Sequence, residues 1–353
     1  METERRIDSK KLKDFASQVY QKIGVPADEA DLVADTLVVA DLQGMHSHGV
    51  MRLPQYGNKI IGGGFKPGRK GRVLKETDST ILLDGENGLG QVITVRAMEE
   101  AIRKAKIAGS GIVGVTRSNH NGAGAYYALM AVKQNMIGIL STNGSPNMPV
   151  WGGMTKMTGP LPLTVGVPAQ NELPFCLDTA MGVSSKGKIV YAGEKGEKIP
   201  FGWAVDKEGK PTEDPKKYLD GGWILPIGGY KGFGITTALE ILTGILTGGP
   251  FGTEVGNLFT GPPEESQGLG HFVMALNIES FMPVEEFKQR MDRMIRMMKE
   301  SKLQPGVKEI IIPGEPEFRK EKDRLVNGIP LSVQVISNIT AFAEQIGLAG
   351  ASL

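Results

Sequence analysis

Three glycines at positions 109, 111 and 114 limit what this chain can fold into. They spell G-x-G-x-x-G in the run GSGIVG, which is the spacing of the phosphate-binding turn of Rossmann folds. That turn needs glycines that follow a strand and open a helix, because the helix N-terminus must face the phosphates. Here the order is reversed, since a helical stretch over 92–108 precedes the glycines and a strand-like run follows them. We therefore interpret Gly109 as a helix stop and do not expect a Rossmann turn.

The rest of the chain alternates between helical and strand-like periodicity. Apolar runs between glycine-rich turns predict strands over 80–83, 112–115, 137–140, 163–167, 175–177 and 271–278. Helical spacing predicts helices over 12–23, 30–40, 92–108, 124–133, 284–299 and 332–346, and a buried apolar helix over 234–246. The polar stretch 182–222 is typical of hairpins and a surface excursion. We expect a mixed α/β fold, with an α/β lobe over 76–282 and a helical lobe built from 1–75 and 283–353.

Composition excludes several classes of function. The 40 Lys and Arg nearly balance the 39 Asp and Glu, which argues against a nucleic-acid partner, because such partners need clustered positive charge. One cysteine excludes an internal disulfide and a cysteine-based metal site. No segment reaches the roughly 20 apolar residues that span a bilayer. The polar run METERRIDSK has no signal-peptide core, so we expect a cytoplasmic protein without a membrane partner.

The run ADLQGMHSHGVMRLPQY holds two of the four histidines. His48 suits proton transfer to a carbonyl oxygen because the histidine pKa lies near neutral pH. Arg52 can pair with a carboxylate through two hydrogen bonds, and Ser47 can orient or share a proton with a neighbour. A polar transition from helix to loop explains the same residues without any function. A metal site at His46 and His48 is disfavoured, because no set of carboxylates accompanies them.

Four further runs combine polar residues with small ones at the ends of predicted elements. Each has a structural explanation as well: a capped turn, a strand end, a surface lysine or a helix start. A helix that opens after small residues suits an anion, since its amides are exposed. The runs are VTRSNHNGAGAYY with His120, PFCLDTAMG with Asp178, LPIGGYKGFG with Lys231, and IIIPGEPEF, predicted as a strand that leads into Pro313, Gly314 and Glu315.

These five runs in this order resemble the type-2 malate/L-lactate dehydrogenase family. The resemblance covers about residues 9–336. It implies an oxidoreductase that transfers hydride between NAD(P)H and a small 2-keto acid, on a non-Rossmann mixed sheet with a helical lobe formed by both termini. It also implies a homodimer. We expect NAD as the cofactor, with NADP as the alternative, and no metal.

The resemblance assigns a role to individual residues. His48 becomes the acid/base, assisted by Ser47 and Asp178, while Arg52 and His120 become substrate ligands. The residues expected to contact the cofactor are His120, Asn121, Gly122, Asp178, Thr179, Ala180, Lys231, Gly232, Pro313, Gly314 and Glu315.

Position 46 departs from the family pattern. The family commonly has an acid there, in a D-S-H-G run, whereas this chain has His46. If that acid orients the catalytic histidine, the orientation here comes from elsewhere, for example from Asp178.

The motifs leave the substrate open within the family. A specialised substrate such as sulfolactate, ureidoglycolate, diketogulonate or a cyclic imino acid fits the same residues. A non-catalytic binding protein on the same scaffold is disfavoured, because it has no physical need to retain His48 together with Arg52.

Overall fold

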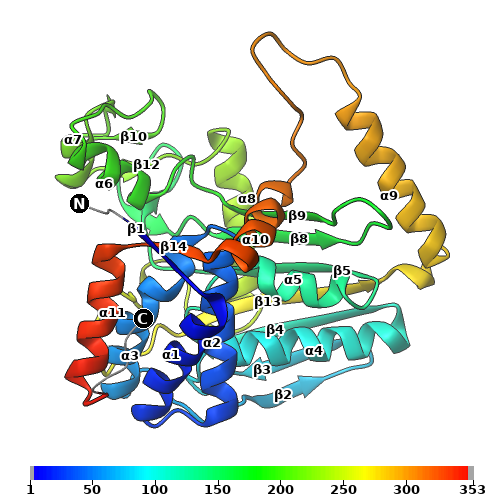
Figure 1. Cartoon of the computed structure of the whole chain (residues 1–353), viewed down its shortest axis with the longest axis horizontal. Coiled ribbons are helices and arrows are strands. Elements are labelled where there is room, and N and C mark those ends of the chain that lie inside the picture. Colours follow the sequence, from blue (N-terminus) through cyan, green and yellow to red (C-terminus); the bar gives the residue numbers. More distant parts are fainter. Residues whose placement is uncertain (1–3, 349–353) are drawn as a thin grey trace.

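The computed structural model describes residues 4–348, and its centre is a sheet of seven strands (Figure 1). Only β3 and β4 are parallel neighbours; every other pair in this sheet is antiparallel. The predicted mixed sheet is confirmed. In spatial order the strands are β2 (Arg72–Glu76), β3 (Thr80–Asp84), β4 (Ser110–Ser118), β13 (Leu269–Asn277), β5 (Met136–Thr142), β8 (Pro162–Val167) and β9 (Phe175–Ala180).

The glycines at 109–114 serve packing rather than phosphate binding. Helix α4 (Gly90–Ala108) ends at Gly109, which has a φ of 80°, so the predicted helix stop is confirmed. A Cβ on Gly111 would lie 2.0 Å from the carbonyl oxygen of Ala101. Glycine at 111 therefore lets β4 approach α4 closely, as only a residue without a side chain can.

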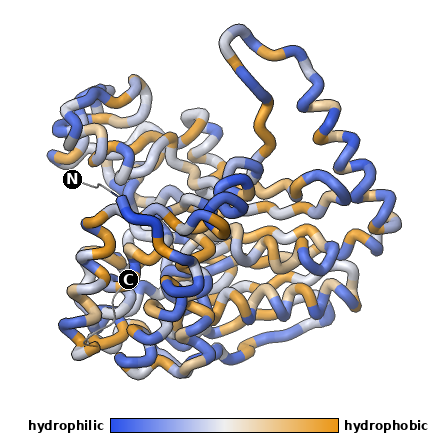
Figure 2. The backbone as a smooth tube through the Cα atoms, viewed as in Figure 1, coloured by the Kyte–Doolittle hydropathy of each residue, from blue (hydrophilic) through white to orange (hydrophobic). Residues whose placement is uncertain are grey.

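Helices cover both faces of the sheet. On one face lie α4 and α5 (Ala125–Val132), which pack on β4, β5, β8 and β13. On the other face lies α8 (Tyr230–Glu240), which continues into the π-helical turn η3 (Ile241–Ile245). A Cβ on Gly270 of β13 would lie 1.8 Å from the carbonyl oxygen of Thr243, so this helix also approaches the sheet closely. Figure 2 shows apolar residues concentrated along the strands between these layers.

A second core joins the two ends of the described chain. Strand β1 (Glu4–Ile7) pairs antiparallel with β14 (Ile329–Ser332), so helices from both ends pack together. The shared core includes Leu12, Leu37, Leu53 and Phe342. The helices are α1 (Ser9–Lys22), α2 (Ala27–Leu42), α3 (Leu53–Ile61) and α11 (Val333–Gln345).

The predicted burial of the apolar helix over 234–246 is wrong for one of its faces. The inward face carries Thr236 and Thr243, whose hydroxyls donate to backbone carbonyls one turn earlier. The outward face exposes Ile235, Ile241, Ile245 and Leu246 by 45%, 47%, 55% and 61%. Hydropathy predicts that such residues avoid water, but it does not say which surface covers them.

The stretch 182–222 is more helical than predicted. It forms a small three-stranded sheet with two short helices around Ile189, Tyr218 and Ile224. The hairpin prediction is therefore only partly right. The elements are α6 (Lys186–Glu194), β10 (Ala204–Val205), β11 (Pro211–Thr212), α7 (Pro215–Leu219) and β12 (Trp223–Ile224).

Helix α9 (Val284–Lys299) and the segment 300–312 extend away from the sheet (Figure 1). The helix is held at Asp292, whose carboxylate accepts backbone N–H groups of Gln170, Asn171 and Glu172. The strand predicted before Pro313 is absent from the described chain, because residues 308–312 have no neighbouring strand to pair with. Helix α10 (Glu315–Asn327) follows and returns to the body.

Among residues 4–348, no helix is both long and apolar enough to cross a membrane. The division into an α/β lobe over 76–282 and a helical lobe from both ends stays a prediction.

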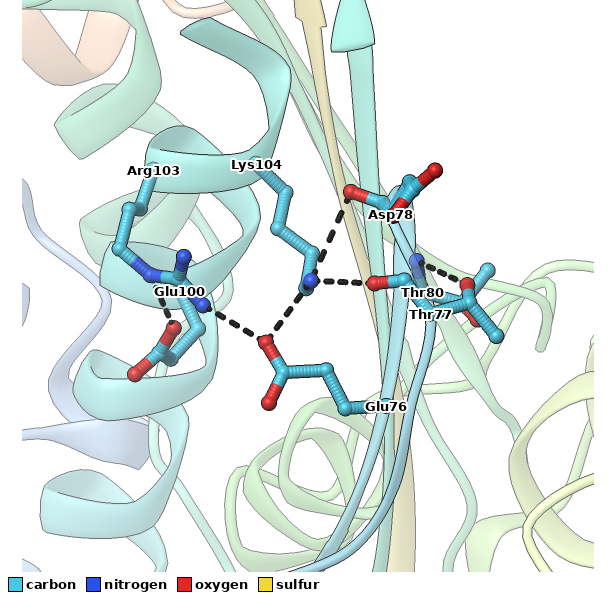
Figure 3. Close-up of polar contacts among 7 residues, drawn as sticks. All are labelled: Glu76, Thr77, Asp78, Thr80, Glu100, Arg103 and Lys104. Atoms are coloured by element: carbon cyan, nitrogen blue, oxygen red, sulfur yellow. Dashed lines mark hydrogen bonds and ion pairs between the residues drawn. The ribbon is translucent and has the colours of Figure 1, made fainter. Parts of the chain in front are cut away.

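A buried lysine joins α4 to the turn between β2 and β3 (Figure 3). Lys104 is 4% exposed, and its ammonium group donates to the carbonyl oxygens of Thr77 and Asp78. It also lies 2.9 Å from a carboxylate oxygen of Glu76. All three ammonium protons thus have acceptors, which offsets the cost of removing the charge from water.

We expect Lys104→Met to lower the free energy of unfolding by about 1–3 kcal/mol, because it removes the charged hydrogen bonds that tie α4 to this turn. Chemical denaturation measures this change. Lys106→Met, on the same helix, is the control, since the Lys106 ammonium group bonds only an exposed glutamine among the described residues. Equal loss in both variants would contradict the assigned role of the buried ammonium group.

Candidate active site

Two short 3-10 turns carry the first group of predicted site residues. They are η1 (His46–His48) and η2 (Val50–Arg52), and they link α2 to α3. The hydroxyl of Ser47 lies 2.9 Å from Nδ1 of His48, so the predicted neighbours are in contact. This bond fixes one ring nitrogen of His48 and leaves Nε2 for another partner.

A buried carboxylate beneath these turns fixes their backbone. Asp41, near the end of α2, accepts the N–H of Val50 at 2.7 Å. A Cβ on Gly49 would lie 2.1 Å from the Oδ1 atom of Asp41, so the chain passes directly over the carboxylate. Burial raises the pKa of Asp41 above its usual value, while His46 and the Val50 N–H oppose that rise.

The second group lies where β4 ends. The ring of His120 stacks on that of His48, with centroids 5.5 Å apart and an interplanar angle of 18°. Nδ1 of His120 lies 2.6 Å from the hydroxyl of Tyr56 and accepts the N–H of Gly122 at 3.2 Å. Because Nδ1 accepts, the ring proton of neutral His120 is on Nε2.

Sequence reasoning missed Tyr56. Its only signal is its position four residues after Arg52, which does not distinguish it from a core aromatic residue. The contact with His120 joins residues far apart in the chain and depends on how α3 packs against the end of β4.

Both stacked histidines are neutral near pH 7. Burial, and then the positive charge of Arg52, lower the pKa of His48 to about 4. Burial lowers the pKa of His120 well below its usual value, and His48 and Arg52 add to that effect. Two imidazoles beside a guanidinium therefore give a site that favours a negative charge.

Arg52 is held between its own turn and an aromatic ring. Its Nε donates to the carbonyl oxygen of Ser47 at 2.6 Å, and its guanidinium carbon lies 4.7 Å from the ring centroid of Phe259. Among residues 4–348, no hydrogen bond from the Nη atoms is present, so they can serve an external acceptor. This geometry suits a carboxylate, which pairs with two guanidinium N–H groups.

A second buried lysine holds the segment that carries Phe259. The ammonium group of Lys59, in α3, donates to the carbonyl oxygens of Gly261, Pro262 and Glu265. Farther along this segment, Gln267 accepts the backbone N–H of His120 at 3.0 Å. Neither Phe259 nor Lys59 carries a sequence signal that marks it as part of a site.

A cavity of about 180 Å³ adjoins the residues that precede these turns. Asp178 lies in its wall, and its carboxylate accepts the hydroxyl of Thr164 and the N–H of Ala125, both at 2.8 Å. Burial raises the pKa of Asp178. The lining residues are Gln43, Met45, Ala125, Leu129, Cys176, Leu177, Asp178, Pro313, Gly314, Glu317 and Phe318.

Asp178 does not orient His48 through a hydrogen bond in the described chain. Its two oxygens accept hydrogen bonds from Thr164 and Ala125, and the bond to Nδ1 of His48 comes from Ser47. The catalytic role expected for Asp178 stays a prediction. The carboxylate near position 46 belongs to Asp41.

The Pro313–Gly314 turn forms the opposite wall of the cavity. Pro313 accepts the N–H of Cys176 at 2.9 Å, and Gly314 has a φ of 92°, with room for no side chain against Cys176. The Glu315 carboxylate is engaged inside the protein by Lys299 and Arg319 at 2.6 and 2.5 Å. Glu315 thus fixes this turn, and its predicted contact with a cofactor stays a prediction.

The other predicted cofactor residues differ in accessibility. Lys231 is exposed in the first turn of α8, and a Cβ on Gly232 would meet the Ile227 carbonyl oxygen at 1.8 Å. Thr179 and Ala180 end β9, close to the start of this helix through the Gly182–Pro226 bridge. The side chain of Asn121 is buried on Thr94.

Comparisons with known proteins identify the family of this chain. A family model described as malate/L-lactate dehydrogenase matches residues 7–340. Malate dehydrogenase of Pyrococcus abyssi (strain GE5 / Orsay) is 40% identical, over 98% of this chain and 96% of that protein. Ureidoglycolate dehydrogenase (NAD(+)) of Escherichia coli (strain K12) is 31% identical over 87% of each.

A solved structure has the same fold. Sulfolactate dehydrogenase from Methanocaldococcus jannaschii superposes with a TM-score of 0.91 at 40% identity, over 97% of this chain and 98% of that one. At this coverage the likeness includes both the sheet and the helices from the chain ends.

We expect the imidazole of His48 to titrate near pH 4 rather than near 6.5. The folded state then binds this proton less readily than the unfolded chain, so this group makes stability rise with pH between about 4 and 6.5. Histidine-selective NMR titration, with His48→Gln for assignment, measures the pKa. Arg52→Met removes a repelling charge and should raise it; a wild-type value near 6.5 would refute the assigned environment.

Proposed function

Because the chain belongs to the malate/L-lactate dehydrogenase family, we propose that it interconverts small 2-hydroxy acids and 2-keto acids with a nicotinamide cofactor. It is an oxidoreductase. One observation links the proposed activity to particular residues. The Ser47–His48 pair, the His120 ring and the Arg52 guanidinium converge on one place. Gln43 and Met45, just before this turn, line the cavity that Asp178 also lines.

His48 is the proposed acid/base. Reduction of a 2-keto acid leaves an alkoxide at C2 that needs a proton, and a positioned histidine can supply it. Ser47 occupies Nδ1, so Nε2 is the nitrogen that exchanges the proton. An anionic substrate beside Arg52 offsets the guanidinium charge and thereby raises the pKa of His48. Substrate binding and loading of the proton are then coupled.

Arg52 is the proposed ligand of the substrate carboxylate. Its Nε is fixed to the carbonyl oxygen of Ser47 and Phe259 covers one face, so the remaining N–H groups point in a defined direction. The carboxylate and the C2 carbonyl of a 2-keto acid are adjacent, as are Arg52 and His48 on the turn. His120 contributes its Nε2 proton as a second donor to the substrate.

This cavity is the proposed site of the nicotinamide nucleoside. Leu129, Leu177 and Phe318 offer apolar walls to an aromatic ring, and Asp178 and Glu317 offer carboxylate acceptors to hydroxyl or amide groups. The Pro313–Gly314 turn also lines the cavity, and the exposed Lys231 is the proposed ligand of a phosphate. When bound, the reduced cofactor supplies the hydride.

We favour NAD over NADP, and a substrate with a second anionic group over lactate itself. The name of the E. coli relative specifies NAD(+). Malate and sulfolactate, which name the relatives at 40% and 41% identity, both carry a second acid group.

The test is a spectrophotometric screen of NADH and NADPH oxidation with oxaloacetate, sulfopyruvate, pyruvate, 2-ketoglutarate and a cyclic imino acid. We expect oxidation with oxaloacetate or sulfopyruvate, and His48→Ala to lower kcat about 10²- to 10⁴-fold while the Kd of the cofactor stays nearly unchanged. Arg52→Met should raise KM for every acid. Near-normal turnover of His48→Ala would remove it as acid/base; silence across the panel would exclude these substrates.

We also propose that the protein is a homodimer. The outward face of α8 and η3 exposes Ile235, Ile241, Ile245 and Leu246, a larger apolar stripe than a single chain in water favours. The segment after α9 adds exposed Leu303 and Ile311 on a part of the chain that extends from the body. A second copy of the chain covers such surfaces.

Sedimentation velocity should give the mass of two chains for the wild-type protein. Ile241→Glu combined with Ile245→Glu should shift it to one chain, because two charges cannot be buried without partners. Ile107→Glu is the control, since Ile107 is 79% exposed at the end of α4, on the opposite face of the sheet. A wild-type mass of one chain would contradict the dimer.

A further inference from the structure

Helix α10 connects the two walls of the candidate site. Its N-terminus follows the Pro313–Gly314 turn, which lines the cavity, and its last turn lies beside the end of α2. Arg324 projects from that last turn. Its Nη1 donates to the carbonyl oxygen of Asp41 and lies 3.1 Å from Nε2 of His46.

The contact with Arg324 determines how His46 bonds. A guanidinium group can only donate hydrogen bonds, so Nε2 of His46 accepts and its ring proton lies on Nδ1. Nδ1 is 2.7 Å from Oδ1 of Asp41 and donates to it. His46 therefore relays an interaction from α10 to the carboxylate beneath the turn.

Asp41 passes the interaction to the backbone on the far side of His48. Its Oδ2 accepts the N–H of Val50, while its Oδ1 accepts from His46. The carboxylate thus holds the turn on both sides of His48. The side chain of Asp41 is 1% exposed, so water does not compete for these bonds.

We propose that Arg324, His46 and Asp41 are positioning residues that set the Ser47–His48 turn and tie it to α10. The inference rests on the proposed role of His48 as acid/base. An acid at position 46, which is common in the family, would place a second carboxylate against Asp41 and could not donate to it when ionised. Histidine at this position makes the link to α10 possible in this chain.

The relay of Arg324, His46 and Asp41 fixes the position of the histidine turn and takes no part in proton or hydride transfer. Within residues 4–348, the hydrogen bonds that run from Arg324 through His46 and Asp41 to Val50 include neither Ser47 nor Nε2 of His48. A displacement of about 1 Å in a reacting group costs up to about 10²-fold in rate. Loss of the relay should therefore lower kcat more than it changes the Kd of the cofactor.

The experiment compares His46→Leu and Arg324→Met with the conservative His46→Asn, whose amide can still donate to Asp41. We expect kcat to fall about 10- to 100-fold in the first two and only a few-fold in His46→Asn. The double variant should be no worse than the poorer single one, because both break one network. Lys322→Met, on the exposed side of α10, is the control.

Two further measurements separate positioning from a loss of stability. The assays are run well below the melting temperature of each variant. If Arg324→Met does not fold, the milder Arg324→Lys, which keeps the positive charge, replaces it. The NMR signal of the His48 ring should shift in Arg324→Lys and stay in place in Lys322→Met. Normal kcat with only a lowered melting temperature, or equal losses in His46→Asn and His46→Leu, would overturn the inference.

His48→Ala distinguishes failure of the relay from failure of the proposed function. If His48→Ala is inactive while His46→Leu turns over normally, the relay is wrong and the acid/base role stands. If His48→Ala stays active, the acid/base role is wrong, and an unmoved His48 signal in Arg324→Lys would overturn the relay as well.

Discussion

The buried carboxylate of Asp41 is the point at which three separate parts of the chain meet. Asp41 lies near the end of α2 and accepts the backbone N–H of Val50, which follows the histidine turn. Through His46 it is also linked to α10. A carboxylate is stable in the protein interior only when its oxygens accept hydrogen bonds. Asp41 therefore needs both of its partners, His46 and the Val50 N–H. Because the turn has no side-chain core of its own, its shape depends on this carboxylate. The positions of Ser47 and His48 on this turn therefore depend on Asp41 as well.

The site combines the Arg52 guanidinium with two histidines, His48 and His120, whose rings take up a proton only weakly. Burial and Arg52 hold the pKa of His48 at about 4, and Tyr56 and the Gly122 N–H occupy the inner nitrogen of His120. In the proposed function, a carboxylate that binds Arg52 offsets its charge and so raises the pKa of His48. The proposed substrate would then help to prepare the proposed acid/base.

Local sequence signals predicted the local parts of this structure. Gly109 ended its helix as expected because the left-handed conformation there favours glycine, and His48 with Arg52 lay on one turn because they are close in sequence. The strand predicted at 310–312 is absent from the described chain, because β-propensity alone does not provide a neighbouring strand to pair with. Tyr56, Phe259 and Lys59 were missed for a related reason: their contacts join segments that only the packed fold brings together. Local patterns made Asp178 and Lys231 candidates for ligand binding, and the family resemblance then assigned the cofactor to these and the other predicted residues.

The pairing of β1 with β14 has a consequence for how the protein is made. During synthesis, α1, α2 and α3 are made before β14 and α11, which complete their core. The nascent helices therefore keep apolar surface exposed until β14 and α11 have been made, whereas the sheet can assemble earlier from strands that lie between. Such a chain is most prone to aggregate during that interval, and truncation before β14 would leave a folded sheet beside an unfinished core.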